Sequence, residues 1–277
     1  MSAQETIAII AGRGSFPSLV ARAAKNAGMR AAIAGFKGFT DQDLVRDADQ
    51  WKLLRMGRLS QLIAYLKSTG ATRVCMAGAI DKPQALSLRP DLRALKVLMR
   101  MRGKGDDALL RALINELETE GFSVVQAADL APSLRAPHGV LSSREPSSQE
   151  WSDLRFGWAA AKRMGELDIG QCVVVRDGVI VAVEAMEGTD QTLQRAGQVA
   201  GPGCVVVKTV KPGQEERVDL PALGKTTIES LIQAKAACLG FEAGKTLFFD
   251  LDESIRLADS ANICLIGLTQ EDIGLSS

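Results

Sequence analysis

The chain has 277 residues and a mass of 29.5 kDa, which suits one large domain or two of ordinary size. Lys and Arg number 33 and so do Asp and Glu, so a nucleic-acid-binding footprint over the whole chain is disfavoured. The single histidine, His138, excludes hydrolases that hold a metal ion through several histidines. The five cysteines show no CxxC pairing, which disfavours a zinc site or a disulfide framework and fits a reducing cytosol.

The first half of the chain alternates short apolar runs with amphipathic stretches. We expect strands at 6–12, 30–34, 73–77 and 122–126, and helices at 16–28, 58–67 and from Asp106 to about residue 120. This alternation predicts a Rossmann-like α/β domain with a parallel sheet. No apolar run approaches the length needed to span a bilayer, and we expect no signal peptide at the N-terminus.

The composition changes between residues 132 and 150, where proline and serine are frequent and periodicity is weak. We therefore expect an N-terminal domain at 1–131, a linker at 132–150 and a second α/β domain at 151–277. Its expected helices are 151–166, a short one after Asp190, 227–239 and 253–260, and its expected strands include 204–209, 246–250 and 263–268. Asp177-Gly178 is a hairpin signal, so this sheet is predicted to be mixed.

Charge is distributed unevenly between the two halves. Residues 1–130 contain 19 Lys and Arg against 13 Asp and Glu, and the remainder contains 14 against 20. Two interpretations stand side by side: chance combined with domain docking, or a first domain that meets an anion and a second that supplies carboxylates.

Two glycine turns follow expected strands of the first domain. Gly12, Gly14 and Ser15 lie between a strand and a helix, where backbone N–H groups favour an anion. The pattern is GxGxxP rather than GxGxxG and no acidic residue marks the second strand, so a dinucleotide site is disfavoured. A phosphate cradle and a plain tight turn remain open. Gly78 and Ala79 form the second turn, for which a close-packed turn is the simpler interpretation.

Two segments near residue 100 carry more charge than structure requires. Lys104, Gly105, Asp106 and Asp107 open a helix that one aspartate suffices to cap, which leaves a lysine and an aspartate for a phosphate or a sugar hydroxyl. Just before them, apolar residues at helical spacing run from Leu88 to Met99 beside a row of basic residues. That stripe fits either a membrane surface or acyl chains, or a plain surface helix with extended arginines.

The second half offers carboxylates and cations. Glu187, Gly188, Thr189 and Asp190 follow an apolar strand that ends near Glu184, a carboxylate that needs a partner. Beyond them, residues 208–224 form a polar loop that is too charged for a simple connection.

A functional loop and a solvated excursion both remain open for this segment. As a functional loop, it offers Lys208 and Lys211 to neutralise phosphates, and Asp219 to bind a divalent metal or orient water. Gly224 and Thr226 open another helix N-terminus. Oxygen ligands without histidine suit Mg²⁺, and the combination indicates phosphoryl chemistry without a Walker motif.

Six segments in one order carry a family resemblance: IAGRGSFP, MAGAIDKP, RGKGDDALLR, ELDIGQCVVV, AVEAMEGTDQTL and KPGQEERVDLPALG. Together they resemble the UDP-2,3-diacylglucosamine pyrophosphatase family of lipid A biosynthesis, found in α-proteobacteria and some other Gram-negative bacteria. The resemblance covers nearly the whole chain, and its last two motifs are the most specific.

The resemblance implies a two-domain enzyme that holds its lipid-bearing substrate between the domains. It implies Mg²⁺-dependent hydrolysis of UDP-2,3-diacylglucosamine to UMP and 2,3-diacylglucosamine 1-phosphate (lipid X), with water attacking the α-phosphorus. The critical acid falls on Asp219, and we add Lys211 as a catalytic cation. Substrate contacts fall on the glycine turns, on 104–107 and on 187–190. A cytosolic enzyme working at the inner face of the cytoplasmic membrane is implied, and a homodimer is compatible with it.

Three positions depart from the family pattern: Arg13 stands for a glycine, Ala79 for an asparagine, and Lys225 for a smaller or apolar residue. They affect individual contacts rather than the reaction. Two other functions stay in view. A dinucleotide-dependent oxidoreductase would need an acidic ribose ligand, and a non-catalytic nucleotide-sugar-binding protein would bind without releasing UMP.

Overall fold

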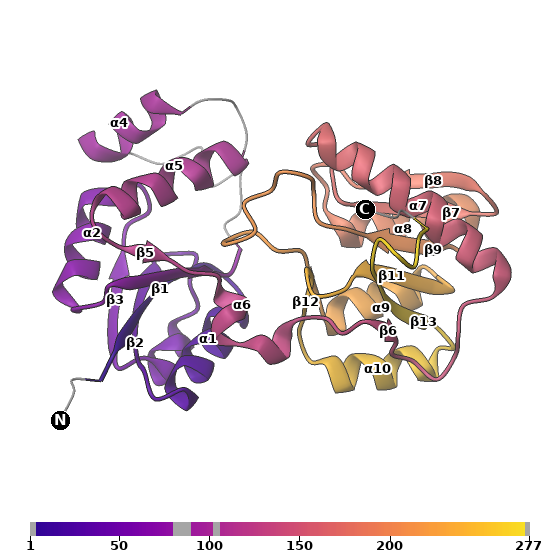
Figure 1. Ribbon diagram of the computed structural model, residues 1–277, viewed down its shortest axis with the longest axis horizontal. Coiled ribbons are helices and arrows are strands. Elements are labelled where there is room, and N and C mark those ends of the chain that lie inside the picture. Colours follow the sequence, from indigo (N-terminus) through magenta and orange to yellow (C-terminus); the bar gives the residue numbers. More distant parts are fainter. Residues whose placement is uncertain (1–3, 80–89, 102–105, 275–277) are drawn as a thin grey trace. The chain divides into compact units, whose positions relative to one another are not determined.

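A computed structural model describes residues 4–79, 90–101 and 106–274. The chain divides into two compact units, coloured from indigo to yellow along the sequence in Figure 1. Unit 1 comprises residues 1–132 and 215–219, and unit 2 comprises residues 133–214 and 220–277. The short stretch 215–219 therefore leaves unit 2, packs with unit 1 and returns.

Unit 1 is built on a parallel sheet with the strand order β3-β2-β1-β4-β5. Its strands are β1 (Thr6–Ala11), β2 (Arg30–Phe36), β3 (Gln50–Leu54), β4 (Arg73–Ala77) and β5 (Ser123–Val124). Strands β1 and β2 are apolar on both faces because helices cover both faces of the sheet. Ile7 and Ile9 point to one core, and Ala8 and Ile10 to the other.

The helices of unit 1 follow from these two cores. Against Ile7 and Ile9 lie α1 (Phe16–Asn26), the 3-10 helix η1 (Gln42–Asp47) and α6 (Ala127–Leu130), each through small or aliphatic residues. Against Ala8 and Ile10 lie α2 (Leu59–Ser68) and α5 (Asp106–Thr119). Helix α4 (Leu92–Arg100) packs on α2 and α5, and a short 3-10 helix, η2 (Pro132–Leu134), leads into unit 2. The Rossmann-like prediction is confirmed.

Unit 2 holds a six-stranded mixed sheet in the order β6-β13-β11-β9-β7-β8. Strands β9 (Val205–Lys208), β11 (Cys238–Glu242) and β13 (Cys264–Leu268) run parallel. The antiparallel members are the hairpin β7 (Cys172–Arg176) and β8 (Val179–Val183), which turns at Asp177-Gly178, and the edge strand β6 (Gly139–Val140). A separate pair, β10 (Ala222–Leu223) and β12 (Leu247–Phe248), completes the unit.

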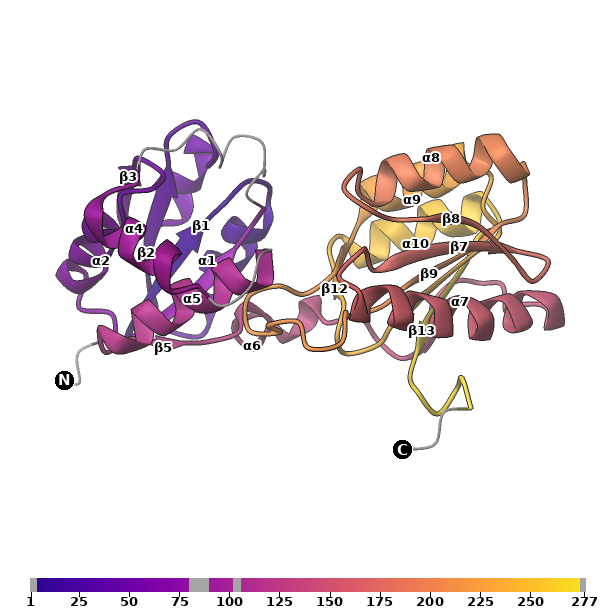
Figure 2. The ribbon, with the colours of Figure 1, turned by 90° about the horizontal axis from the view of Figure 1, so that it is seen from above.

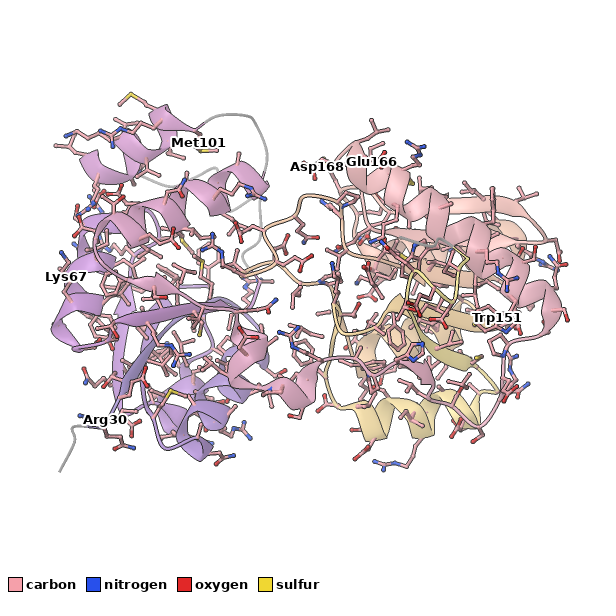
Figure 3. All side chains as sticks on the ribbon, in the orientation of Figure 1. Arg30, Lys67, Met101, Trp151, Glu166 and Asp168 are labelled. Atoms are coloured by element: carbon pink, nitrogen blue, oxygen red, sulfur yellow. The ribbon has the colours of Figure 1, made fainter. Side chains whose placement is uncertain are left out.

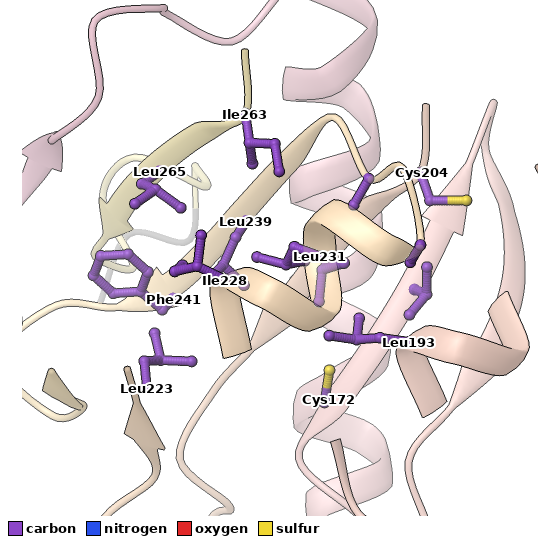
Figure 4. Packing of buried hydrophobic residues seen from close by; sticks show 14 of the residues in the cluster. Cys172, Leu193, Cys204, Leu223, Ile228, Leu231, Leu239, Phe241, Ile263 and Leu265 are labelled. Atoms are coloured by element: carbon purple, nitrogen blue, oxygen red, sulfur yellow. The ribbon is translucent and has the colours of Figure 1, made fainter. Parts of the chain in front are cut away.

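Helices cover both faces of this sheet, as Figure 2 shows: α7 (Ser148–Glu166) lies on one face, and α8 (Thr189–Ala200), α9 (Lys225–Gln233) and α10 (Leu251–Ser260) lie on the other. Leu193, Ile228 and Leu231 of α8 and α9 meet Leu239 and Phe241 of β11 in the largest core, shown in Figure 4. The sheet of the second domain is mixed, as the sequence predicts.

Three segments differ from expectation. The helix expected at 227–239 ends at Gln233, and Cys238–Glu242 is a central strand, because Lys235 takes a positive φ of 52° and turns the chain back. Strand β3 was not anticipated. The stretch expected as a linker is part of unit 2: Val140 pairs with Ile266. Arg144 binds Glu150 at 2.8 Å and also the Ala237 carbonyl, which explains why residues without periodicity are nonetheless fixed.

Candidate active site

The loops after β1 and β4 meet at the carboxyl edge of the unit 1 sheet. The chain runs outward from β1 to β3 and then returns to β4 on the other side of β1, which is the switch point where α/β sheets bind ligands. Arg13 and Ala79 form an antiparallel bridge there, with N–H to O distances between the two backbones of 2.8 and 3.3 Å. The two predicted glycine turns are therefore held together by backbone hydrogen bonds.

Close packing accounts for two of the glycines. A Cβ on Gly12 would lie 2.5 Å from the Ala79 carbonyl oxygen, and one on Gly78 would lie 2.5 Å from the Arg13 carbonyl oxygen. Gly78 also has a φ of +91°. Both positions need glycine whether or not a ligand binds, so the close-packed turn suffices to explain them.

Gly14 is different. Its φ is +86°, and no atom lies within 4 Å of where its Cβ would be. The next residue, Ser15, is the N-cap of α1 and makes no side-chain capping hydrogen bond, and the first turn of α1 holds no acidic residue. Backbone N–H groups at an N-terminus of this kind favour an anion. The Arg13 guanidinium donates to the Gly38 carbonyl and lies over the Phe39 ring.

The start of α5 belongs to the same edge by topology. A helix that connects two parallel strands begins at their carboxyl ends, so Asp106 and Asp107 open α5 beside the β1 and β4 loops. Lys104 and Gly105 lie outside the described residues. Of the 104–107 candidate, the structure thus describes only the backbone of Asp106 and Asp107.

Residues Glu215–Asp219, here called the docking segment, attach to α5 and to the end of β5. The Arg217 guanidinium binds a Glu118 carboxylate oxygen at 2.7 Å, and Arg111 reaches Glu215 at 3.4 Å. The Gln126 side-chain amide donates to the Glu216 carbonyl at 2.7 Å. Val218 packs against the core beneath α2 and α5. Figure 1 shows this loop beside α5 and α6.

Asp219 ends the docking segment. It is partly buried, and its backbone N–H donates to the Glu215 carbonyl at 3.1 Å. Arg217 donates to the Glu215 carboxylate and so lowers the pKa of that carboxyl. Salt bridges, a hydrogen bond and an apolar contact together hold Asp219 on the unit that carries the glycine turns. Sequence reasoning singled out Asp219 but not this attachment.

Unit 2 presents a second edge, at the carboxyl ends of β8 and β9. The Lys208 ammonium is buried and donates to the Thr189 hydroxyl and to the Ala222 carbonyl, both at 3.0 Å. Thr189 in turn donates to the buried Glu184 carboxylate at 2.8 Å. Glu184 thus has the partner it requires, and Lys208 links the start of the polar loop to its end at Ala222.

The remaining candidates of unit 2 also have partners. Arg195 binds Glu187 at 2.7 Å, and Asp190 accepts from Ser230 at 3.0 Å. Gly188 and Gly224 are the N-caps of α8 and α9. Lys225 pairs with Glu253, and Thr226 is exposed. Lys211 binds Asp168 at 2.8 Å. Asp168 lies just beyond α7, next to Glu166 in Figure 3. The structure therefore assigns Lys211 to unit 2 and Asp219 to unit 1.

Sequence reasoning missed several buried polar groups near this second edge. Lys162 binds Glu242 at 2.5 Å, and Glu242 also accepts from the Val210 backbone N–H. In the part of the chain that the structure describes, the Thr209 hydroxyl and the Gln171 side-chain oxygen are buried without a hydrogen-bond partner. Thr209 directly follows Lys208, which is the one signal that could have found it.

The described acidic side chains are dispersed rather than clustered around one point. Among the described residues, no group of three or more His, Cys, Asp or Glu residues is arranged to hold a metal ion. Mg²⁺ commonly takes only one or two carboxylates and completes its shell with water and substrate phosphates. Asp219, partly buried at the end of the docking segment, is a single carboxylate of the kind that this mode of binding uses.

Comparison with known proteins accounts for both units. A model of the LpxI N-terminal domain matches residues 6–134, and a model of the LpxI C-terminal domain matches residues 137–266. The chain belongs to the LpxI family. The UDP-2,3-diacylglucosamine pyrophosphatase LpxI of Caulobacter vibrioides is 34% identical over 96% of this chain and 98% of its own length. The two-domain architecture of the family matches the two α/β units seen here.

Other matches are partial. The bifunctional purine biosynthesis protein PurH of Deinococcus radiodurans is 34% identical over 40% of this chain and 21% of its own length. Among solved structures, a biotin carboxylase from Campylobacter jejuni aligns with 72% of this chain and 42% of its own at 14% identity and a TM-score of 0.28. Within the described helices, none is both long enough and apolar enough to cross a membrane.

Proposed function

We propose that this protein hydrolyses the pyrophosphate bond of UDP-2,3-diacylglucosamine, releasing UMP and 2,3-diacylglucosamine 1-phosphate (lipid X) for lipid A biosynthesis. One observation carries the proposal: a relative named for this activity matches 96% of the chain, including the docking segment that bears Asp219. Because Glu215–Asp219 packs on the unit that carries the glycine turns, the candidate acid and the candidate anion cradle belong to one body.

In this proposal, the N-terminus of α1 beside Gly14 holds phosphate oxygens through backbone N–H groups. Water attacks the α-phosphorus, the bond from that phosphorus to the bridging oxygen breaks, and the electron pair leaves with the sugar phosphate. Asp219 orients the attacking water and accepts its proton. Arg217 and Gln126 keep the docking segment, and with it Asp219, in place.

We further propose Mg²⁺ as the cofactor, bound by Asp219 and by phosphate oxygens of the substrate. When bound, it supplies neutralisation of the charge that develops on the phosphates. The acylated substrate places the reaction at a lipid surface, so we propose that the enzyme works at the cytoplasmic face of the inner membrane.

The decisive experiment is UMP release from UDP-2,3-diacylglucosamine dispersed in detergent, measured with Mg²⁺ and with EDTA. We expect release with Mg²⁺ and its loss with EDTA. Run in ¹⁸O-water, attack at the α-phosphorus places the label in UMP, whereas attack at the β-phosphorus places it in the sugar phosphate. Tight binding without any UMP release would indicate a nucleotide-sugar-binding protein instead, and dependence on a nicotinamide would indicate an oxidoreductase.

Asp219→Asn tests the assigned acid. We expect turnover to fall by about 10²- to 10⁴-fold with little change in substrate binding, because the amide can neither take a proton nor carry charge. Glu216→Gln is the matched control, since it removes a carboxylate from the same segment while keeping the backbone carbonyl that Gln126 binds. Wild-type turnover in Asp219→Asn would refute the role of Asp219.

A further inference from the structure

Helix α4 attaches to unit 1 through its polar side. The Arg93 guanidinium binds Glu116 at 2.6 Å and also pairs with Glu120, both on or directly after α5. The Asp91 carboxylate accepts from the backbone N–H groups of Ala94 and Ser60, at 2.8 and 2.9 Å, and so caps α4 and ties it to α2. Val97 is the one buried apolar side chain of the helix.

The opposite side of α4 is apolar and faces outward. Leu92 is 80% exposed and Met99 is 71% exposed, and Leu95 and Leu98 are also exposed. Residues 92, 95 and 99 share one face at helical spacing, and residue 98 borders it. Figure 1 shows α4 as an outer layer on α5, with the sheet on the other side of α5.

This orientation is the reverse of an ordinary surface helix, which buries its apolar stripe and exposes its polar one. Four large apolar side chains together on the outside of one short helix form the kind of patch that marks an interaction surface. The polar attachment through Asp91 and Arg93 fixes the helix with this patch outward, so a simple roll of α4 toward the core would break the ion pairs and the cap.

Charge identifies the partner. Lys96 and Arg100 lie one turn apart along the border of the apolar face, and both are exposed. The helix itself contains no acidic residue. Apolar residues that enter an acyl layer, bordered by cations that meet anionic headgroups, are the pattern of a helix lying in a membrane interface.

We propose that the outer face of α4 docks this protein on a bilayer of anionic phospholipid. The surface adds to the proposed function, since it would bring the enzyme to the layer that holds a diacylated substrate. Binding of α4 to the bilayer is nevertheless a separate property from turnover, because none of the α4 residues is part of the candidate active site.

The test is flotation of the purified full-length protein with vesicles of phosphatidylglycerol and phosphatidylcholine, and with vesicles of phosphatidylcholine alone. We expect wild type to bind the anionic vesicles and to be released by high salt. Leu92→Ser/Met99→Ser should lower the partition coefficient by about tenfold or more, because two side chains no longer enter the acyl layer. Lys96→Glu/Arg100→Glu should lower it by a similar factor on anionic vesicles alone.

The matched control is Leu167→Ser/Val199→Ser, which removes two side chains of similar exposure, 72% and 71%, from unit 2. It should bind like wild type, and thermal melts establish that every variant is folded. UMP release from detergent-dispersed substrate is measured in parallel. We expect the α4 variants to retain it, so failure of docking and failure of the proposed reaction are distinguishable.

Four results would overturn the proposal. One is wild type that fails to bind anionic vesicles, and another is binding that is equal in all variants. The third is a loss of turnover in detergent with vesicle binding intact, which would show that the face contacts substrate acyl chains. A shift from dimer to monomer in Leu92→Ser/Met99→Ser, seen by sedimentation without vesicle binding, would assign the face to a second copy and equally reject docking.

Discussion

The carboxyl edges of the two sheets share one arrangement of turns and helices but differ in the groups that lie beside the helix N-termini. In each, glycine-containing turns lead from strands into helix N-termini. At the edge of unit 1 the turns are backbone against backbone, with Gly12 and Gly78 in close contact and the side of Gly14 open. At the edge of unit 2 the space beside the helices is filled by the chain's own Lys208, Thr189 and Glu184.

This difference indicates that the edge of unit 1 suits an anion, whereas the polar groups at the edge of unit 2 support a loop. A buried lysine that already donates to a hydroxyl and a carbonyl is held by groups of the protein itself, whereas α1 begins without an acidic residue in its first turn. The edge of unit 1 is thus the better candidate for phosphate, and Lys208 serves to fix the end of the polar loop at Ala222. Four changes would break or sharpen this contrast.

The largest effect is expected from Lys208→Met. The substitution removes the buried ammonium that donates to the Thr189 hydroxyl and the Ala222 carbonyl, and two charge-assisted hydrogen bonds are lost together. We therefore expect unit 2 to lose about 3–5 kcal/mol in its free energy of unfolding. Urea denaturation measures it. Lys211→Met is the control from the same loop: its partner Asp168 is well exposed, so the loss should stay below about 1 kcal/mol. Equal losses would mean that the two edges are not organised differently.

Next is Gly78→Ala. Its Cβ would meet the Arg13 carbonyl at 2.5 Å at a φ of +91°, so we expect a loss of about 2–4 kcal/mol in stability. Gly70→Ala, with a φ of +75° and no atom near its Cβ position, isolates the conformational part at about 1 kcal/mol. If the two variants unfold at the same urea concentration, the close contact of Gly78 with the Arg13 carbonyl is not the reason that glycine is required at this position.

The docking segment should respond to charge exchange. Arg217→Glu removes the ion pairs with Glu118 and Glu215 and introduces repulsion. We expect kcat to fall by about tenfold with little effect on global stability, because Arg217 and Glu118 are each 41% exposed. Arg217→Glu combined with Glu118→Arg should recover most of kcat. A double variant as slow as the single one would indicate that Arg217 contacts substrate rather than positions the segment.

The smallest effect is a pH dependence of the same attachment. Arg217 lowers the pKa of Glu215, so the carboxylate stabilises the docked segment fully above the ordinary glutamate pKa. That contribution, about 1 kcal/mol, is lost as pH falls through the lowered pKa of the folded state. Hydrogen exchange of residues 215–219 should accelerate relative to β9 in that range. Glu215→Gln should abolish the pH dependence, and its persistence in that variant would assign it to another group.

Much of the fold could be predicted from local pattern. The two apolar strands appear almost as expected, at Thr6–Ala11 and Arg73–Ala77, because burial on both faces leaves a clear signature. The amphipathic helix that begins at Phe16 also appears as expected. The segment after Gln233 is predicted wrongly, as a helix that continues to residue 239. Its small residues suit helix and strand equally, and only the positive φ at Lys235 and the pairing of Cys238 with Cys264 decide the outcome.

The sequence nominates candidate site residues one by one but does not give their arrangement. Gly14 and Asp219 stand out from spacing and residue type. That the Lys208 ammonium reaches Glu184 through the Thr189 hydroxyl depends on how β8 and β9 are placed in the sheet, which no local pattern contains. The contact of Arg217 with Glu118 joins positions 99 residues apart for the same reason.

The route of the backbone has a consequence for dissection. Since the chain passes between the units at 132–133, 214–215 and 219–220, cutting the gene after residue 132 would yield an N-terminal fragment that lacks Val218 from its own core. Such a half should be less stable than unit 1 within the intact chain, and a synthetic peptide spanning 210–224 should bind it in trans. Neither unit can therefore be replaced by a foreign domain unless residues 215–219 are kept with unit 1.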